Sequence, residues 1–338
     1  MRAAVFKGIE NIQVEDVPEP EGGAEDVVVK VHACGICGSD LHTYTHGSFV
    51  QPGQVMGHEF AGEIVHVGDA VEGLSLGDRV TASPIVPCMQ CARCKEGRYN
   101  LCANAWANAI AYGRPGAFAE YVKIPNPVAG ENVFRLGHEV SDEAGALVEP
   151  LAVAVHAVKL AGRVEGATTL VLGLGTIGLQ MVQALRARGA GRIIGVDVSA
   201  KRIDAAAALG AEALDASDGL EAALAKGDDI DVVFECSGVS AVAEAALEHV
   251  RAGGSIIVIA LYDDPITFNP TALVQREIRL EGSIAYTSED FRDAVELLSK
   301  GIAQTAPLVT HREPLDRIGE AFTVQLRKEE SIKVLVEP

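Results

Sequence analysis

The stretch that decides the fold is "VLGLGTIG", residues 171–178, which ends an apolar run and carries three closely spaced glycines. The following residues, "GLQMVQALRARG" (178–189), have the apolar spacing of a helix, and "IIGVDV" (193–198) resembles a second buried strand. A G-x-G-x-x-G pattern alone would be weak evidence for a nucleotide-binding site. Between a strand and a helix, with a second strand after them, it is typical of a dinucleotide-binding unit.

Each glycine of this pattern has a physical role in holding a dinucleotide. Gly173 permits a tight turn, Gly175 lets the pyrophosphate approach a helix N-terminus, and Gly178 lets that helix pack on the strand. Asp197 lies 19 residues after Gly178 at the end of the second strand, where it would accept hydrogen bonds from the adenosine ribose. We therefore expect a cofactor contact from Gly173, Gly175, Thr176, Ile177, Gly178 and Asp197.

Two patterns divide the chain outward from this stretch. Residues 149–285 alternate apolar runs with Ala- and Leu-rich segments, which predicts βαβ units and a doubly wound parallel sheet. Residues 1–148 contain short Val-rich segments broken by Gly and Pro, which predicts a β-rich domain. We assign the tail, 286–338, to that β-rich domain. The predicted fold class is α/β with two domains, the first one discontinuous.

Composition excludes several classes of function. The chain has 338 residues, 48% hydrophobic and 22% charged, with a formal net charge of −19, which argues against nucleic acid or an anionic membrane as partner. We see no run of 18 uncharged apolar residues and no secretion signal, and we expect a cytoplasmic protein. Its seven cysteines then need another reason than disulfides.

Four of those cysteines are clustered in "CMQCARCKEGRYNLC" with the spacing C-x2-C-x2-C-x7-C. Four thiolates this close fit a closed tetrahedral zinc site without room for substrate, so we expect a structural role. An iron–sulfur cluster also takes four cysteines and is the alternative. The expected ligands, in a lobe at about residues 86–104, are Cys88, Cys91, Cys94 and Cys102.

A second metal site is suggested by "CGICGSDLH" (34–42) together with His58 and Glu59 of "GHEF" and with Glu149. A catalytic zinc takes three protein ligands and keeps one open position, so one cysteine, His58 and one carboxylate would suffice. Each of these residues could also have a purely structural role. His58 alone could be a satisfied polar residue, and Glu149, just before a proline, could simply be an acid at a helix N-terminus.

These residues together resemble the zinc-dependent medium-chain dehydrogenase/reductase family. Within it the sequence is most similar to the sorbitol, butanediol and threonine dehydrogenase branch, nearest the 2,3-butanediol dehydrogenases. The motifs occur in the family's order and, with the tail, cover nearly all of the chain. They are "GICGSDLH", "GHEFAGEIVHVG", "GDRV", the four-cysteine cluster, "EAGALVEPLAVAVHA", "VLGLGTIGL", "FECSGV" and "SIKVLVEP".

The resemblance implies a GroES-like catalytic domain, a Rossmann NAD-binding domain and two zinc ions per chain, one catalytic and one structural. It makes Cys37 and His58 ligands of the catalytic zinc. Glu59 and Glu149 are then alternative carboxylate ligands. Cys34 has no family role.

The resemblance also assigns a proton path and two supporting residues. Ser39 would take the proton of the alcohol and pass it on through the cofactor ribose and His42. Asp40 would orient His58, and Arg202 would flank the adenine. We therefore expect an enzyme that transfers hydride between NAD and a secondary alcohol or small diol such as 2,3-butanediol.

The alternatives are a sorbitol-like polyol dehydrogenase and an L-threonine dehydrogenase. A zinc-free quinone reductase would lack the cysteine lobe and the ligands Cys37 and His58, and a non-catalytic NAD-binding protein would need no Ser39 and His42. Substrate contacts are expected from Tyr44 and from the loop 102–118. Its aromatic residues are Trp106, Tyr112 and Phe118.

The resemblance further implies a homodimer or homotetramer. In the family, a segment such as "DPITFNP" (264–270) pairs across a two-fold axis.

Overall fold

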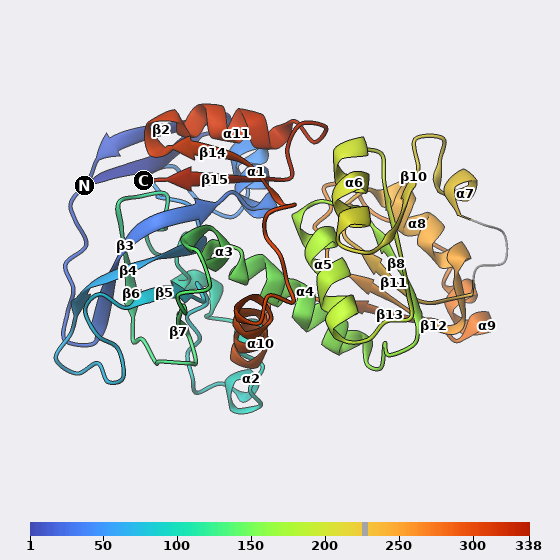
Figure 1. Ribbon diagram of the computed structural model, residues 1–338, viewed down its shortest axis with the longest axis horizontal. Coiled ribbons are helices and arrows are strands. Elements are labelled where there is room, and N and C mark those ends of the chain that lie inside the picture. The colour runs from blue at the N-terminus through green and yellow to red at the C-terminus, as the bar shows by residue number, and fades with distance from the viewer. Residues whose placement is uncertain (225–228) are drawn as a thin grey trace. The chain divides into compact units, whose positions relative to one another are not determined.

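The computed structural model describes residues 1–224 and 229–338, which form two units (Figure 1). The first unit comprises Met1–Ala152, Tyr286–Gly301 and Val309–Pro338, and the second comprises Val153–Ala285 and Ile302–Leu308. The expected limits differ at two places. Residues 149–152 belong to the first unit, because the helix of residues 148–161 begins in that unit and continues into the second. Residues 302–308 belong to the second unit. The backbone N–H of Gln304 donates to Oε1 of Gln183 at 2.6 Å, which ties 302–308 to a helix of the second unit.

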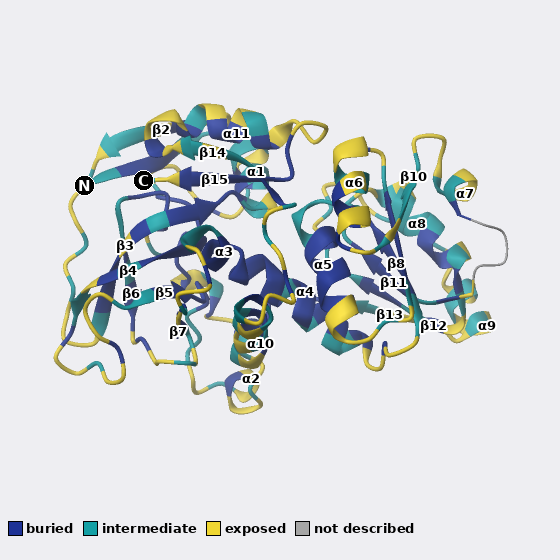
Figure 2. Cartoon of the chain, in the orientation of Figure 1, coloured by how far each residue is buried: buried dark blue, intermediate teal, exposed yellow. Residues whose placement is uncertain are grey.

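The second unit is built on a six-stranded, wholly parallel sheet in the order β10-β9-β8-β11-β12-β13. Counted from β8 in chain order this is 3-2-1-4-5-6, the arrangement of dinucleotide-binding sheets. The central strands β8 and β11 are almost fully buried, as their apolar sequences require (Figure 2). The strands are β8 (Thr168–Leu172), β9 (Arg192–Asp197), β10 (Glu212–Asp215), β11 (Ile230–Glu235), β12 (Val250–Val258) and β13 (Arg279–Gly282).

Helices connect these strands and pack on them. Helices α5 and α6 lie against β8, β9 and β10, α8 lies against β11 and β12, and α9 contacts β12. The segment 264–270 contains no strand, and α9 begins at Pro270. The helices are α5 (Thr176–Ala187), α6 (Ala200–Ala208), α7 (Leu220–Ala223), α8 (Ser240–His249) and α9 (Pro270–Arg276).

The first unit is built on a seven-stranded sheet in the order β14-β15-β3-β4-β5-β7, with β6 also paired to β3. Strand β15 is inserted between β14 and β3, and it pairs Leu335 with Gly35 and Val336 with Cys34. A separate hairpin precedes the sheet. The strands are β1 (Arg2–Gly8), β2 (Asn11–Asp16), β3 (Asp26–Gly35), β4 (Glu59–Val67), β5 (Arg79–Ala82), β6 (Tyr121–Pro125), β7 (Val133–Arg135), β14 (Val309–Pro314) and β15 (Lys333–Glu337).

The hydrophobic core of the first unit lies between this sheet, the hairpin and the helix α11. Val27, Val29 and Val31 of β3 enter this core at every second position, as expected for a strand, and β4 contributes Phe60 and Ile64. The helical segments are α1 (Gly38–His46), α2 (Ala92–Lys95), η1 (Tyr99–Leu101), η2 (Trp106–Asn108), α3 (Asp142–Ala146), α4 (Val148–Ala161), α10 (Ser288–Ser299), η3 (Leu315–Arg317) and α11 (Ile318–Leu326).

Among the described residues, no helix has both the length and the apolar character that a membrane crossing requires.

Candidate active site and nucleotide site

The first unit brings a sulfur, a nitrogen and an oxygen donor together. One ligand atom each from Cys37, His58 and Glu59 lies within 4.8 Å of the other two. Cys37 precedes α1 in extended backbone, and the β3–β4 ladder sets Glu59 opposite Gly35. We refer to Cys37, His58 and Glu59 as the ligand trio. The donor types and their spacing fit a zinc ion with three protein ligands and an open fourth position.

A buried lysine from a distant strand reaches the ligand trio. Nζ of Lys333 donates to Oε2 of Glu59 at 2.5 Å and to the carbonyl oxygen of Ile36 at 2.8 Å. The side chains of Lys333 and Glu59 are only 2% and 1% exposed. Burial lowers the pKa of Lys333, but the charges of Glu59 and Cys37 outweigh it, and the pKa is above its usual value. Lys333 was missed from the sequence. The available signal was a charged residue opening the apolar strand "KVLVE".

Glu149 lies outside the ligand trio, in the first turn of α4. Burial raises the pKa of Glu149 to about 7, the charge of Glu59 raises it too, and His58 opposes the rise. The Tyr286 hydroxyl is nearby, and burial and the charge of Glu149 raise the pKa of that tyrosine. Both interpretations of Glu149 suit this position, because the residue is an acid at a helix N-terminus and also a buried neighbour of the trio. Its role as an alternative ligand remains a prediction.

Asp40 lies beside His58 but is not hydrogen-bonded to it. Its Oδ1 is 3.8 Å from Nδ1 of His58, and its Oδ2 accepts the backbone N–H of Cys37 at 2.9 Å. Burial raises the pKa of Asp40. Burial lowers the pKa of His58, but Tyr112, Asp40 and Cys37 raise it more. In this geometry Asp40 holds the backbone of one ligand and faces the ring of another.

Ser39 and Tyr112 join α1 to the loop 102–118. Their hydroxyl oxygens are 2.9 Å apart. The Tyr112 ring lies 5.4 Å from the His58 ring and 5.5 Å from that of Trp106, between centroids. Burial raises the pKa of Tyr112 to about 12, so its hydroxyl stays protonated at neutral pH. His42, three residues after Ser39 on α1, has its ring 6.0 Å from the His46 ring.

Two of the expected substrate contacts pack against Phe322. Phe118 is fully buried, and its ring is 5.8 Å from that of Phe322. Tyr44 packs on the same Phe322 at 5.0 Å. Both belong to the packing of the core. Of the four aromatic candidates, Tyr112 has its ring next to that of His58, and Trp106 has its ring next to that of Tyr112.

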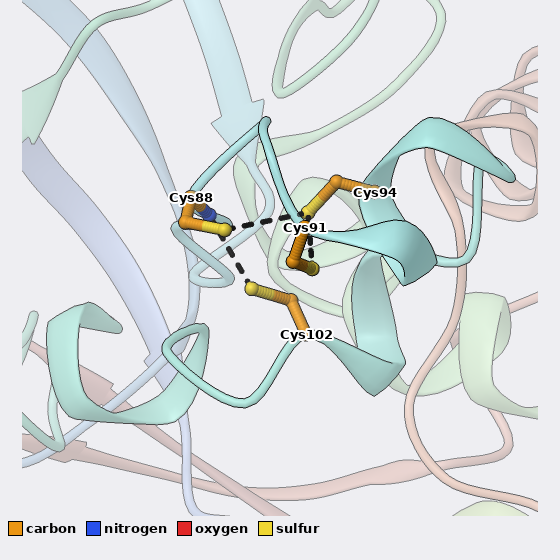
Figure 3. Close-up of side chains that lie close together, drawn as sticks. All are labelled: Cys88, Cys91, Cys94 and Cys102. Atoms are coloured by element: carbon orange, nitrogen blue, oxygen red, sulfur yellow. Dashed lines mark hydrogen bonds between the residues drawn. The ribbon is translucent and has the colours of Figure 1, made fainter.

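The four cysteines of the lobe converge as their spacing predicts (Figure 3). The Sγ atoms of Cys91 and Cys94 are 3.5 Å apart and those of Cys88 and Cys94 4.0 Å, and the backbone N–H of Cys88 donates to Sγ of Cys102 at 3.4 Å. The backbone N–H groups of Gln90 and Cys91 lower the pKa of Cys88 to about 6, whereas burial raises the pKa of Cys94 to about 12. All seven cysteines are outside disulfides. The lobe fits a metal with four thiolate ligands and no open position.

The glycine-rich loop of the second unit has the geometry that its sequence predicts. Gly173 has φ +86°, and a Cβ there would lie 2.7 Å from Cα of Ser237. A Cβ on Gly178 would lie 1.9 Å from the carbonyl oxygen of Gly173. Gly175 precedes α5, and a Cβ there would meet only Nη1 of Arg202, at 3.8 Å. The first turn of α5, with Thr176 and Ile177, is therefore open to a pyrophosphate.

Asp197 ends β9 beside this loop. Its Oδ2 accepts the N–H of Leu174 at 2.7 Å, and its Oδ1 accepts those of Val198 and Ser199 at 2.8 and 2.9 Å. Nη1 of Arg202 is 3.9 Å from Oδ2 of Asp197. Burial lowers the pKa of Arg202 and Asp197 raises it, with a net fall. Backbone donors thus fix the carboxylate at the edge where a ribose would bind.

Sequence reasoning missed a second acidic residue at the same edge of the sheet. Glu235 ends β11 and is fully buried. Its carboxylate accepts the Ser237 N–H at 2.8 Å and the Tyr262 hydroxyl. Since Gly173 packs on Ser237, Glu235 supports the turn of the glycine-rich loop. The signal was a carboxylate that closes the apolar run "DVVFE".

Comparison with known proteins agrees with both sites. Residues 23–141 match the alcohol dehydrogenase GroES-like domain and residues 176–300 match the zinc-binding dehydrogenase family. The chain is 36% identical to sorbitol dehydrogenase of Bacillus subtilis (100% of this chain, 97% of the relative) and 35% identical to (R,R)-butanediol dehydrogenase of the same organism (100% of both).

Among solved structures, one described as a zinc-binding dehydrogenase from Sinorhizobium meliloti 1021 bound to NADP has a TM-score of 0.92 and 34% identity, covering 100% of this chain and 99% of that one. The predicted fold and family are confirmed. The parallel sheet with its glycine-rich loop, the ligand trio and these relatives lead to one conclusion. The chain belongs to the zinc-dependent medium-chain dehydrogenase/reductase family and is an alcohol or polyol dehydrogenase that uses a nicotinamide cofactor.

Proposed function

We propose that this protein oxidises a secondary alcohol or small diol, such as 2,3-butanediol, with NAD⁺. The observation that carries the proposal is the ligand trio with the Ser39 hydroxyl on the adjoining helix. When bound, zinc would polarise the substrate oxygen and the nicotinamide would accept the hydride. Ser39 accepts the proton of the substrate hydroxyl while it gives up its own, and His42, three residues on, passes a proton toward solvent. Cys37 and His58 hold the metal, with Glu59 or Glu149 as the carboxylate ligand.

The rival functions lack support at these sites. A zinc-free quinone reductase has no use for the ligand trio or the four-cysteine lobe. A non-catalytic nucleotide-binding protein has no use for a hydroxyl beside an open metal position. A sugar polyol or L-threonine stays the second candidate for the substrate, because sorbitol dehydrogenase is among the relatives.

The substrate is tested with a panel of alcohols and NAD⁺, scored by kcat/KM. We expect 2,3-butanediol and 2-butanol to be oxidised more efficiently than sorbitol or L-threonine, because the apolar Trp106 ring lies beside Tyr112 at the site. A panel led by sorbitol or L-threonine would replace the proposed substrate class. No turnover of any alcohol by zinc-loaded protein would reject the proposed function.

The preference for NAD over NADP is proposed from Asp197. A 2′-phosphate at the adenosine ribose would face this carboxylate, and at about 4 Å and an effective dielectric near 20 each charge pair costs roughly 4 kcal/mol before screening. The phosphate carries nearly two negative charges. A quarter of the summed repulsion, about 2 kcal/mol, therefore already exceeds a tenfold preference, since about 1.4 kcal/mol is a factor of ten. Arg202, at 3.9 Å from Asp197, offsets part of the repulsion and is expected to flank the adenine.

Cofactor choice is measured as kcat/KM for NAD⁺ against NADP⁺. We expect a ratio of at least about ten in favour of NAD⁺. Asp197→Ser should narrow that ratio, mainly by improving NADP⁺ binding. Equal use of both cofactors by the wild-type protein would mean that Arg202, and not Asp197, controls the choice.

Two further features complete the proposal. Each chain is proposed to bind two zinc ions, one at the ligand trio and one in the four-cysteine lobe. We also propose a homodimer or homotetramer. In the described part of the chain, no strand pairs with the outer edge of β13, and Leu280 on that strand is 40% exposed. Pairing with a second copy would cover this edge.

A further inference from the structure

Two protein hydroxyls adjoin the ligand trio as a hydrogen-bonded pair. The Ser39 and Tyr112 oxygens are 2.9 Å apart. Ser39 follows Cys37 by two residues at the start of α1, and the Tyr112 ring lies 5.4 Å from the ring of His58. The pair therefore lies beside two members of the ligand trio, Cys37 and His58. The proposed function uses only one member of the pair, Ser39.

The Tyr112 side chain is fixed by packing, which leaves its hydroxyl in a defined place. The Trp106 ring meets it edge-on at 5.5 Å and an interplanar angle of 78°. Tyr112 also packs against the core of the first unit. Phenylalanine would fill the same space, so packing alone does not explain the hydroxyl. A polar group held this rigidly is suited to recognise another polar group.

We propose that Tyr112 is a specificity-determining residue that binds the second hydroxyl of a vicinal diol, while Ser39 serves the hydroxyl that is oxidised. Each protein hydroxyl carries one proton and two lone pairs. Their mutual bond uses one proton and one lone pair, so a proton and several lone pairs remain for the substrate. Two hydroxyls one hydrogen bond apart match two hydroxyls on adjacent carbons. A monoalcohol satisfies only the Ser39 side of the pair.

This inference rests on the proposed function, because it assigns the substrate class of the same site. Its experiment compares 2,3-butanediol with 2-butanol, which has the same carbon skeleton and one secondary hydroxyl. The zinc-loaded enzyme is tested as wild type, Tyr112→Phe, Ser39→Ala and Tyr121→Phe. Tyr121 is the control, since it lies in β6 opposite Lys30 of β3. Melting temperatures establish that each variant is folded.

For Tyr112→Phe we expect kcat/KM to fall about tenfold with the diol, the loss of one hydrogen bond to a substrate group. With 2-butanol, kcat/KM of the variant should stay within about twofold of wild type, and the pH profile of that reaction should be unchanged. Ser39→Ala should lower kcat/KM at least about a hundredfold with both substrates, because this substitution removes the proton acceptor. Tyr121→Phe should match wild type.

Three results would overturn the inference: an equal loss on both substrates by Tyr112→Phe, a shifted pH profile with 2-butanol, or no loss on either. The first two would make Tyr112 a positioning residue that acts through Ser39. If wild type oxidises neither substrate, the proposed function fails by itself. In that case, calorimetric binding of the two alcohols to zinc-loaded wild type and Tyr112→Phe tests the role of Tyr112. If the variant keeps the same preference for the diol as wild type, Tyr112 does not bind the second hydroxyl.

Discussion

Two cysteines three positions apart have different surroundings, and single substitutions should separate them. Cys37 belongs to the ligand trio, whereas Cys34 is fully buried in β3 and burial raises the pKa of its thiol. Cys37→Ala should abolish turnover and lower the zinc content by one ion per chain. Cys34→Ala, the matched control, should keep kcat/KM within a few fold of wild type and retain the metal. Equal losses in both variants would remove Cys37 from its role as ligand.

Lys333 makes a second prediction at the scale of single residues. Removing one partner of a buried ion pair costs about 3 kcal/mol or more, so Lys333→Met should lower the melting temperature of the metal-free protein by about 5 °C or more. The double variant Lys333→Met/Glu59→Gln should recover much of that loss, because no buried charge is left unpaired. Lys300→Met, which breaks an exposed pair with Glu296, should change little. Additive losses in the double variant would contradict the pairing of the two charges.

The four-cysteine lobe and the ligand trio should differ in how readily they lose metal. The lobe, carried by α2, η1 and their flanking loops, offers four ligands and no open position, while the trio leaves one position exposed to a chelator. After brief chelator treatment we expect about one zinc per chain and no activity, with activity restored by added zinc. Metal analysis and rate measurements check this. Full activity with one zinc lost would reverse the two assignments.

The sequence predicted elements with a local signal and missed those that depend on distant partners. The strand–glycine–helix pattern of β8 and α5 predicted the parallel sheet, and the cysteine spacing predicted the convergence in the lobe. The contact of Lys333 with Glu59 links residues 274 positions apart, which no local pattern encodes. The Ser39–Tyr112 bond spans 73 positions in the same way. The bonds between Gln304 and Gln183 of α5 span 121 positions and are equally remote.

At the scale of the whole molecule, the assembly should depend on the outer edge of β13. Leu280→Glu places a charge on that edge and should shift the protein toward monomer in sedimentation at micromolar concentration. The control is Leu76→Glu in the first unit, where the leucine is 68% exposed and outside any strand. That variant should sediment like wild type. A wild-type protein that sediments only as monomer would refute the proposed oligomer, and an unchanged Leu280→Glu would place the interface elsewhere.

The insertion of β15 beside β3 has a consequence for biosynthesis. Glu59 leaves the ribosome early, while the lysine that neutralises it is translated 274 residues later. Until then the nascent chain carries a carboxylate that cannot be buried without cost, and Cys34 and Gly35 of β3 lack the strand that pairs with them. The second unit, by contrast, has its six strands complete before that point. During translation, therefore, the nucleotide-binding half can mature first, and the metal-binding half must wait.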